Sequence, residues 1–370
     1  MGRFFCFFLV LFFSPSTLSG QNTPPPQLQP RSAEPAKAPS PAASVATERQ
    51  IQLDVQVTDK SGAPVRGLQK PDFTLLDDKR PQNILSFQAV DRAAAAASDP
   101  PVEVVLVVDA VNAPFQAVSY ERSELKKFLL QNGGKLALPT SLIIFSDTGT
   151  EIQKTSSRDG NALSALYDQY ATGLRIVNRS QGFWGAAERF EMSLKTLNSF
   201  VQYEKTRPGR KLMVWFSPGW PLLSGPNIEL TPKEEENFFD SIVAASTGLR
   251  QARITLYSID PLGLADAGGV RIIYYKEFLK GVSSPNRAMP ANLSLQVLAV
   301  QSGGRVLNSS NDLTAEIVQS VSDAEAFYVL SFEAARADRA NEYHAIEVTV
   351  DKPGFTARTR TGYYAQPYAP

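Results

Sequence analysis

Hydrophobic and polar residues follow two different patterns along the chain. Between about Val102 and Ser322, near-continuous apolar runs alternate with segments whose apolar residues recur at helical spacing. Two runs, Val102–Asp109 and the start of Arg210–Pro221, lack the polar alternation of a half-exposed strand, which is typical of central strands covered on both faces. The pattern predicts an α/β domain with a doubly wound, mostly parallel sheet.

The helical segments have recognisable faces and boundaries. Phe190, Leu194, Leu197 and Val201 repeat along one helix face, and Thr231-Pro-Lys-Glu234 is a capping box that opens another helix. Further strands are predicted at Ser141–Ser146, Glu151–Gln153, Ile254–Ile259 and Arg305–Leu307, and further helices at Val118–Leu130, Leu293–Ala299 and Leu313–Val321.

Strand signals mark both ends of the part of the chain that is expected to fold. Period-two alternation begins at Ile51, Leu53, Val55 and Val57, and β-branched and aromatic residues return from Ala326 onward. The strands predicted at the N-terminal end are too few to bury a core alone. We therefore expect one β-sandwich built from residues 49–92 and 324–366, with the α/β domain of residues 101–323 inserted between its halves.

The first 48 residues have a different character. Arg3 precedes the apolar stretch Phe4–Phe13, and small residues follow, so residues 1–20 are interpreted as a signal peptide. Residues 21–48 are rich in Pro and Ala and are expected to be a disordered linker. The one cysteine, Cys6, lies in the signal, and an exported chain without disulfides favours a secreted or periplasmic bacterial protein. No other apolar run reaches membrane-spanning length.

The charge balance narrows the class of partner. Of the 370 residues, 37 are basic and 37 acidic, with no basic run. A protein that binds nucleic acid or an anionic membrane surface needs a basic excess to neutralise phosphates. A protein or an envelope component is therefore the expected partner.

Many spaced turn residues together carry a resemblance to a known family. They are Val57-Thr-Asp59, Gly62, Pro64-Val65, Gly67-Leu68, Asp72-Phe73, Gln82, Ile84, Phe87, Asp109, Pro208–Lys211, Trp215–Pro221, Ser302–Arg305, Asp312-Leu313, His344–Ile346 and Gly362–Tyr364. From Gln50 onward the chain resembles the VWFA-related domain proteins described from acidobacteria, members of the von Willebrand factor A superfamily. The resemblance implies a vWA-like fold and no established activity.

Domains of this superfamily often hold Mg²⁺ through an Asp-x-Ser-x-Ser turn, a Thr and a second Asp. Here the turn reads Asp109-Ala-Val-Asn-Ala113, and Ser217 follows the later strand where a carboxylate belongs. A second loop offers Asn178 or Ser180. The resemblance thus implies a degenerate site of Asp109, Asn112 and Ser217 that binds Mg²⁺ weakly, with Asp109 as a turn or helix-cap residue as the alternative.

Aromatic residues are expected on the same rim. Phe115, Phe183, Trp184 and Trp220 lie in predicted loops, where rigid aromatic side chains make effective binding anchors. The alternative is that Phe115 and Trp220 fold back and close the end of the sheet. An insertion at residues 266–290 either completes a partner groove or forms a simple loop.

Enzyme classes find little support in the residues. His344 is the only histidine and falls in a predicted outer strand, and no phosphate-binding loop or nucleophile elbow is present. We expect an exported, non-catalytic protein-binding module. Two alternatives stay open, a secreted hydrolase that uses Asp109 and Asp260, and an envelope structural protein that associates with itself.

Overall fold

The computed structural model describes residues 49–94, 101–171, 182–223, 229–263 and 274–367. The chain divides into two units, Met1–Ser44 and Val45–Pro370, and all described residues belong to the second. The predicted signal peptide and linker, Asn178, Ser180 and the first part of the 266–290 insertion lie outside the described residues. Within those ranges, no helix combines the length and apolar character needed to cross a bilayer.

A central sheet with mostly parallel strands forms the α/β part. Its strand order is β11-β10-β9-β5-β6-β7, with β8 also paired to β6. The strands are β5 (Val102–Asp109), β6 (Lys135–Ser146), β7 (Gly149–Ile152), β8 (Ser157–Asp159), β9 (Arg210–Phe216), β10 (Ile254–Ile259) and β11 (Val306–Leu307). β7 and β8 run antiparallel to β6, and the other pairs are parallel. The predicted mostly parallel α/β sheet is confirmed.

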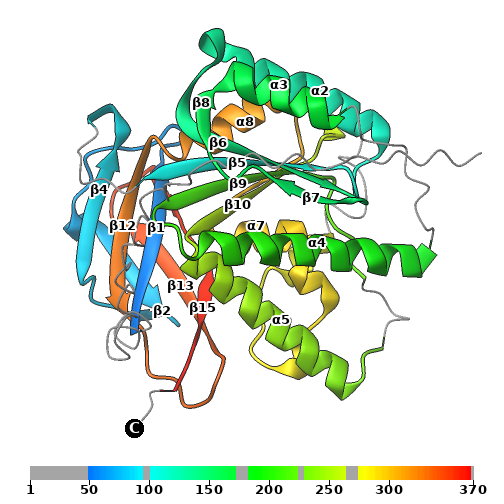
Figure 1. Ribbon diagram of the computed structural model, residues 1–370. Helices are drawn as coiled ribbons and strands as arrows, with labels where there is room; N and C mark the ends of the chain where they lie inside the picture. The colour runs from blue at the N-terminus through cyan, green and yellow to red at the C-terminus, as the bar shows by residue number, and fades with distance from the viewer. Residues whose placement is uncertain (1–48, 95–100, 172–181, 224–228, 264–273, 368–370) are drawn as a thin grey trace, which may run out of the picture. The chain divides into compact units, whose positions relative to one another are not determined.

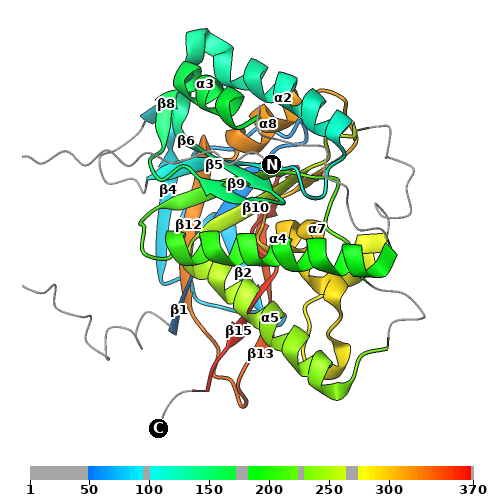
Figure 2. The same cartoon turned by 45° about the vertical axis from the view of Figure 1, so that its right-hand side comes forward.

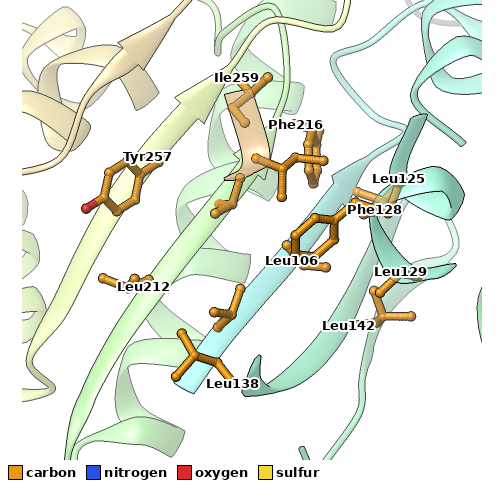
Figure 3. Packing of buried hydrophobic residues seen from close by; sticks show 14 of the residues in the cluster. Leu106, Leu125, Phe128, Leu129, Leu138, Leu142, Leu212, Phe216, Tyr257 and Ile259 are labelled. Carbon is orange, nitrogen blue, oxygen red and sulfur yellow. The ribbon is translucent and has the colours of Figure 1, made fainter. Parts of the chain in front are cut away.

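Helices cover both faces of this sheet (Figure 1). One face carries α2 (Phe115–Leu130), α3 (Gly160–Ala171) and α8 (Leu313–Ser322), and the other carries α4 (Gly182–Glu204), α5 (Pro232–Gln251) and α7 (Leu295–Gln301). Figure 3 shows Leu125, Phe128 and Leu129 of α2 beside Leu106 and Leu142 of the sheet. Each face thus has its own hydrophobic cluster, which explains why β5 is apolar from Val104 to Val108 and β9 from Leu212 to Phe216.

Helix boundaries follow the capping signals. Thr231 Oγ1 accepts a hydrogen bond of 3.4 Å from Glu234 N, and Glu234 Oε2 accepts one of 2.8 Å from Thr231 N, which confirms the capping box of α5. Short 3₁₀ helices occupy Lys70–Asp72, Arg92–Ala94, Gln131–Gly134, Tyr275–Phe278, Pro285–Arg287 and Pro290–Leu293. The described part of the predicted insertion is therefore a series of tight helical turns.

Strands from both ends of the chain pair with one another in two four-stranded sheets. Their orders are β14-β1-β12-β4 and β15-β13-β2-β3. The strands are β1 (Gln50–Thr58), β2 (Phe73–Asp77), β3 (Arg80–Pro81), β4 (Ser86–Asp91), β12 (Ala326–Glu333), β13 (Glu342–Val350), β14 (Thr356–Arg358) and β15 (Gly362–Ala365). Leu53 pairs with Leu330 and Leu75 with Val348, and one hydrophobic cluster draws on both sheets.

Charged and aromatic contacts join these strands to the α/β part. Asp54 of β1 accepts a hydrogen bond of 2.5 Å from Arg253 Nη2 and lies 3.9 Å from Nε of Arg210. The rings of Phe239 in α5 and Tyr364 in β15 meet edge to face, with centroids 6.0 Å apart. Because the side chain of Arg210 is fully buried, its positive charge is balanced by the carboxylate of Asp54 and not by water.

Candidate binding surface at the carboxyl edge of the sheet

Asp109 and Ser217 emerge from neighbouring strands. β5 and β9 pair in parallel with Val108 opposite Phe216. Asp109 and Ser217, which follow these two residues, therefore lie at the same edge of the sheet. The predicted side-by-side arrangement of the two strand ends is confirmed. In open α/β sheets ligands bind at this carboxyl edge, which makes it the first place to examine.

The carboxylate of Asp109 is buried and surrounded by N–H donors. Its Oδ1 accepts hydrogen bonds from the backbone N of Val111 at 3.0 Å and of Asn112 at 2.8 Å. Its Oδ2 accepts from Asn112 Nδ2 at 2.8 Å and from Trp215 Nε1 at 3.1 Å. Asp109 is 0% exposed. The side chain thus holds the β5–α2 turn and the neighbouring strand together.

Asn112 and Ser217 belong to the same network. Asn112 Nδ2 also donates to Ser193 Oγ of α4 at 2.9 Å, and Ser193 Oγ in turn donates to the Arg189 carbonyl at 2.7 Å. Ser217 Oγ accepts from Gly219 N at 3.2 Å, and a side-chain hydrogen bond links Ser217 with Asp109. The structure therefore brings together Asp109, Asn112 and Ser217, as the sequence predicts.

This arrangement does not fit Mg²⁺. Both oxygens of Asp109 already accept two hydrogen bonds, and a cation would have to displace those donors to reach the lone pairs. Burial raises the pKa of Asp109, while hydrogen bonds from Asn112, Trp215 and Ser217 oppose the shift. Of the two sequence interpretations of Asp109, the geometry favours the turn residue over the metal ligand.

Trp215 and Ser193 were not predicted as parts of this network. A signal for Trp215 exists, because Trp215 pairs with Val107, and Asp109 follows Val107 by two residues on the same sheet face. Ser193 shows no comparable signal, since its contact depends on how α4 crosses the sheet.

The predicted aromatic anchors divide into buried and exposed residues. Trp220 is 0% exposed and packs edge to face on Trp215 with centroids 5.0 Å apart, so the prediction of an exposed anchor is wrong for Trp220. Phe183 is 51% and Trp184 81% exposed, and their rings form an edge-to-face pair at 5.7 Å. Phe115 opens α2, and its side chain lies outside the described part of the chain.

The exposed pair lies on the first turns of α4. Ser193 of this helix reaches Asn112 at the carboxyl edge, and Gly182 lies 11 positions before it, about 16 Å along the helix axis. Figure 1 shows one end of α4 extending beyond the strands, and Figure 2 shows α4 and α5 on the same face of the sheet. The aromatic pair therefore lies on the part of α4 that extends past the edge.

Asp260 at the end of β10 also has a local role. It is 5% exposed, and its Oδ1 accepts a hydrogen bond of 2.9 Å from Leu262 N.

A second cluster of ionisable side chains lies in the antiparallel part. Asp77, Asp78 and His344 come together there in an arrangement able to hold a metal ion. His344 was predicted in an outer strand, but β13 lies between β2 and β15 in its sheet, and the proximity of Asp77 and Asp78 was not predicted.

Comparisons with known proteins give the following. No family model matches the chain. No curated protein matches it. Among solved structures, the chain is similar to the pilus adhesin SpaC from Lactobacillus rhamnosus GG, with a TM-score of 0.35 and 11% identity over 85% of this chain and 48% of the adhesin. The chain thus spans about half the length of the adhesin.

Two further solved structures are shorter matches. The manganese-loaded TRAP protein of Plasmodium vivax has a TM-score of 0.31 and 12% identity, and covers 78% of this chain and 100% of its own. The SpRpn10 VWA domain has a TM-score of 0.24 and 14% identity, and covers 61% of this chain and 98% of its own.

Proposed function

We propose that the chain is an exported bacterial protein-binding module in which a vWA-like domain is carried on a β-sandwich made by strands from both ends of the chain. The order β7-β6-β5-β9-β10-β11 supports the vWA-like assignment, because it places the first strand of the domain centrally and continues outward on each side. The resemblance to the acidobacterial VWFA-related proteins belongs to the same proposal.

The aromatic pair Phe183–Trp184 carries the proposed function. Large aromatic side chains with this exposure are costly to leave in water, and Trp is enriched among the residues that dominate binding energy at interfaces. The pair stands on a helix of 23 residues, so little backbone entropy is lost when a partner covers it. A protein partner with an apolar pocket matches this geometry best.

Binding through the aromatic pair requires neither a catalytic reaction nor a metal ion at the carboxyl edge. Asp109 and Asp260 are buried, and each accepts hydrogen bonds from its own turn. A carboxylate-dependent hydrolase requires two carboxyl groups that flank a substrate, with one of them free to accept or donate a proton. These features support a non-catalytic module over the hydrolase alternative.

Partner capture tests the proposal. The parent protein and the Trp184→Ala variant, both untagged, are immobilised through the same surface chemistry and incubated with an extract of the source cells. Bound proteins are then identified by mass spectrometry. Leu85→Ala is the matched control, because Leu85 is 53% exposed in the antiparallel part. We expect a protein retained by the parent and Leu85→Ala and lost from Trp184→Ala.

Two results would count against the proposal. Equal recovery of every retained protein by Trp184→Ala would remove the aromatic pair from the function. Retention of this chain alone, together with a mass that rises with concentration and falls in Trp184→Ala, would favour the self-associating structural protein instead.

A further inference from the structure

We propose that Asp77, Asp78 and His344 form a binding site for a divalent transition-metal ion, independent of the proposed protein-binding function. Asp77 ends β2, Asp78 begins the turn to β3, and His344 lies on the adjacent strand β13. One ligand atom from each of the three residues lies within 4.8 Å of the others.

Each carboxylate is held through one oxygen and offers the other to the site. Asp77 Oδ2 accepts a hydrogen bond of 2.7 Å from the Tyr363 hydroxyl, and its Oδ1 lies 2.9 Å from His344 Nδ1. Asp78 Oδ1 accepts one of 2.9 Å from Ala345 N, and its Oδ2 lies 3.5 Å from the same Nδ1. Second-sphere hydrogen bonds of this kind orient metal ligands.

The imidazole is fixed in the direction of both carboxylates. The side chain of His344 is only 8% exposed, and its ring stacks on Tyr363 with centroids 5.2 Å apart. Because β13 pairs with both β2 and β15, the strand that carries His344 is held from two sides. The three ligand atoms are therefore positioned before any ion arrives, which lowers the entropy cost of binding.

The charge of the cluster favours a cation. Among the described residues, His344 is the only basic side chain within ion-pair distance of either Asp77 or Asp78. The side chain of Asp77 is 1% exposed, so water screens its charge poorly, whereas that of Asp78 is 50% exposed and leaves the site open on one side. A divalent ion would neutralise both carboxylates and take water as a further ligand.

One of the two separations from Nδ1 matches a small transition-metal ion, and the other has to widen by about 0.5 Å. Zn²⁺ binds imidazole nitrogen and carboxylate oxygen at about 2.0–2.2 Å, which places neighbouring ligand atoms about 3.4 Å apart in a tetrahedron. The observed separations from Nδ1 are 2.9 Å and 3.5 Å. An imidazole nitrogen beside two carboxylates suits Zn²⁺ and related transition metals better than Mg²⁺ or Ca²⁺, which prefer oxygen ligands.

The competing role is a purely structural hydrogen bond. In that case His344 Nδ1 carries a proton and donates it to Asp77. A metal ion needs the lone pair of Nδ1, so binding must move the proton to Nε2. Because His344 is the only histidine in the chain, its ring ¹⁵N signals report this change without overlap.

Titration of untagged, chelator-treated protein with Zn²⁺ tests the proposal, using calorimetry for affinity and ¹⁵N NMR for the ring. Asp78→Asn removes the exposed ligand but keeps an oxygen for Ala345 N and tolerates the left-handed backbone at φ 46°. Glu347→Gln is the control, because it removes the same charge from an exposed position on β13.

We expect one Zn²⁺ per chain in the parent and in Glu347→Gln, at least 10-fold weaker binding in Asp78→Asn, and a shift of the Nδ1 signal to a metal-bound value. Three results would each overturn the site: no saturable binding to the parent, unchanged affinity in Asp78→Asn, or a Nδ1 signal that keeps its proton at saturating Zn²⁺.

Discussion

The indole Nε1 of Trp215 donates a hydrogen bond of 3.1 Å to Oδ2 of Asp109, across two neighbouring strands of the central sheet. Both side chains are fully buried. The acidic end of β5 is thereby tied to the interior of β9, and Asn112 of the following turn donates a hydrogen bond to Ser193 of α4, the helix that carries the exposed aromatic pair.

This hydrogen bond should stabilise the fold measurably. Trp215→Phe removes the donor and leaves a buried carboxylate with one partner fewer, at a cost of about 1–3 kcal/mol beyond the loss of ring volume. Trp220→Phe is a matched control, because Trp220 is equally buried and its Nε1 has no hydrogen-bond partner among the described residues. Urea unfolding should place Trp215→Phe below Trp220→Phe in free energy of unfolding, and equal values would contradict the role given to the bond.

Asp54 should matter more than its position in an outer sheet suggests. Asp54→Asn removes the charge that faces Arg253 and the fully buried Arg210, and we expect a loss of about 3 kcal/mol in the free energy of unfolding. The control Asp91→Asn breaks a half-exposed pair with Arg66 and should cost less than about 1 kcal/mol. Similar losses in the two variants would show that the buried pair is not a main link between the parts.

Glu316 predicts a pH dependence of stability. This residue of α8 is 4% exposed, and burial, with a smaller contribution from the charge of Asp260, raises its pKa from 4.5 to about 7. The folded state therefore binds the proton more tightly than the unfolded state does. The contribution of Glu316 to the free energy of unfolding is fully present below pH 4.5. It is lost as the pH rises toward 7, by on the order of 3 kcal/mol.

Chemical denaturation at a series of pH values measures this effect. Glu316→Gln keeps a neutral side chain at every pH and should flatten the decline between pH 4.5 and 7. Glu188→Gln, at an exposed position of α4, should leave the decline as it is. A decline of the same size in Glu316→Gln would assign it to other groups.

The sequence predicted those parts of the fold that depend on local patterns. The apolar runs of β5 and β9 and the capping box of α5 are each written within a few consecutive residues, and all three are confirmed. Helix α3 was missed although its signal is local. Leu163, Leu166 and Tyr167 repeat at helical spacing, and Asp159 accepts hydrogen bonds from the backbone N of Asn161 and Ala162 at the start of the helix. The solvent exposure of individual side chains in turns was harder to predict, because a turn has no periodicity that separates its inner from its outer face. Trp220, predicted to be exposed and found to be buried, is an example.

The parts of the candidate sites that were not predicted depend on contacts between distant segments of the chain. His344 and Asp77 are 267 positions apart and meet only because β13 pairs with β2. The alternation of each strand is visible in the sequence, but the register that places one beside the other is not. The same limit applies to Asn112 and Ser193, which are joined by the path of α4 across the sheet.

The affinity of the captured protein for Phe183→Ala/Trp184→Ala, measured by calorimetry beside the parent, tests the central claim most directly. The account predicts that the double variant binds at least about 30-fold more weakly, as expected when an aromatic residue central to an interface is removed, and that added Mg²⁺ leaves both affinities unchanged. An unchanged affinity in a double variant whose unfolding curve matches that of the parent would contradict the account.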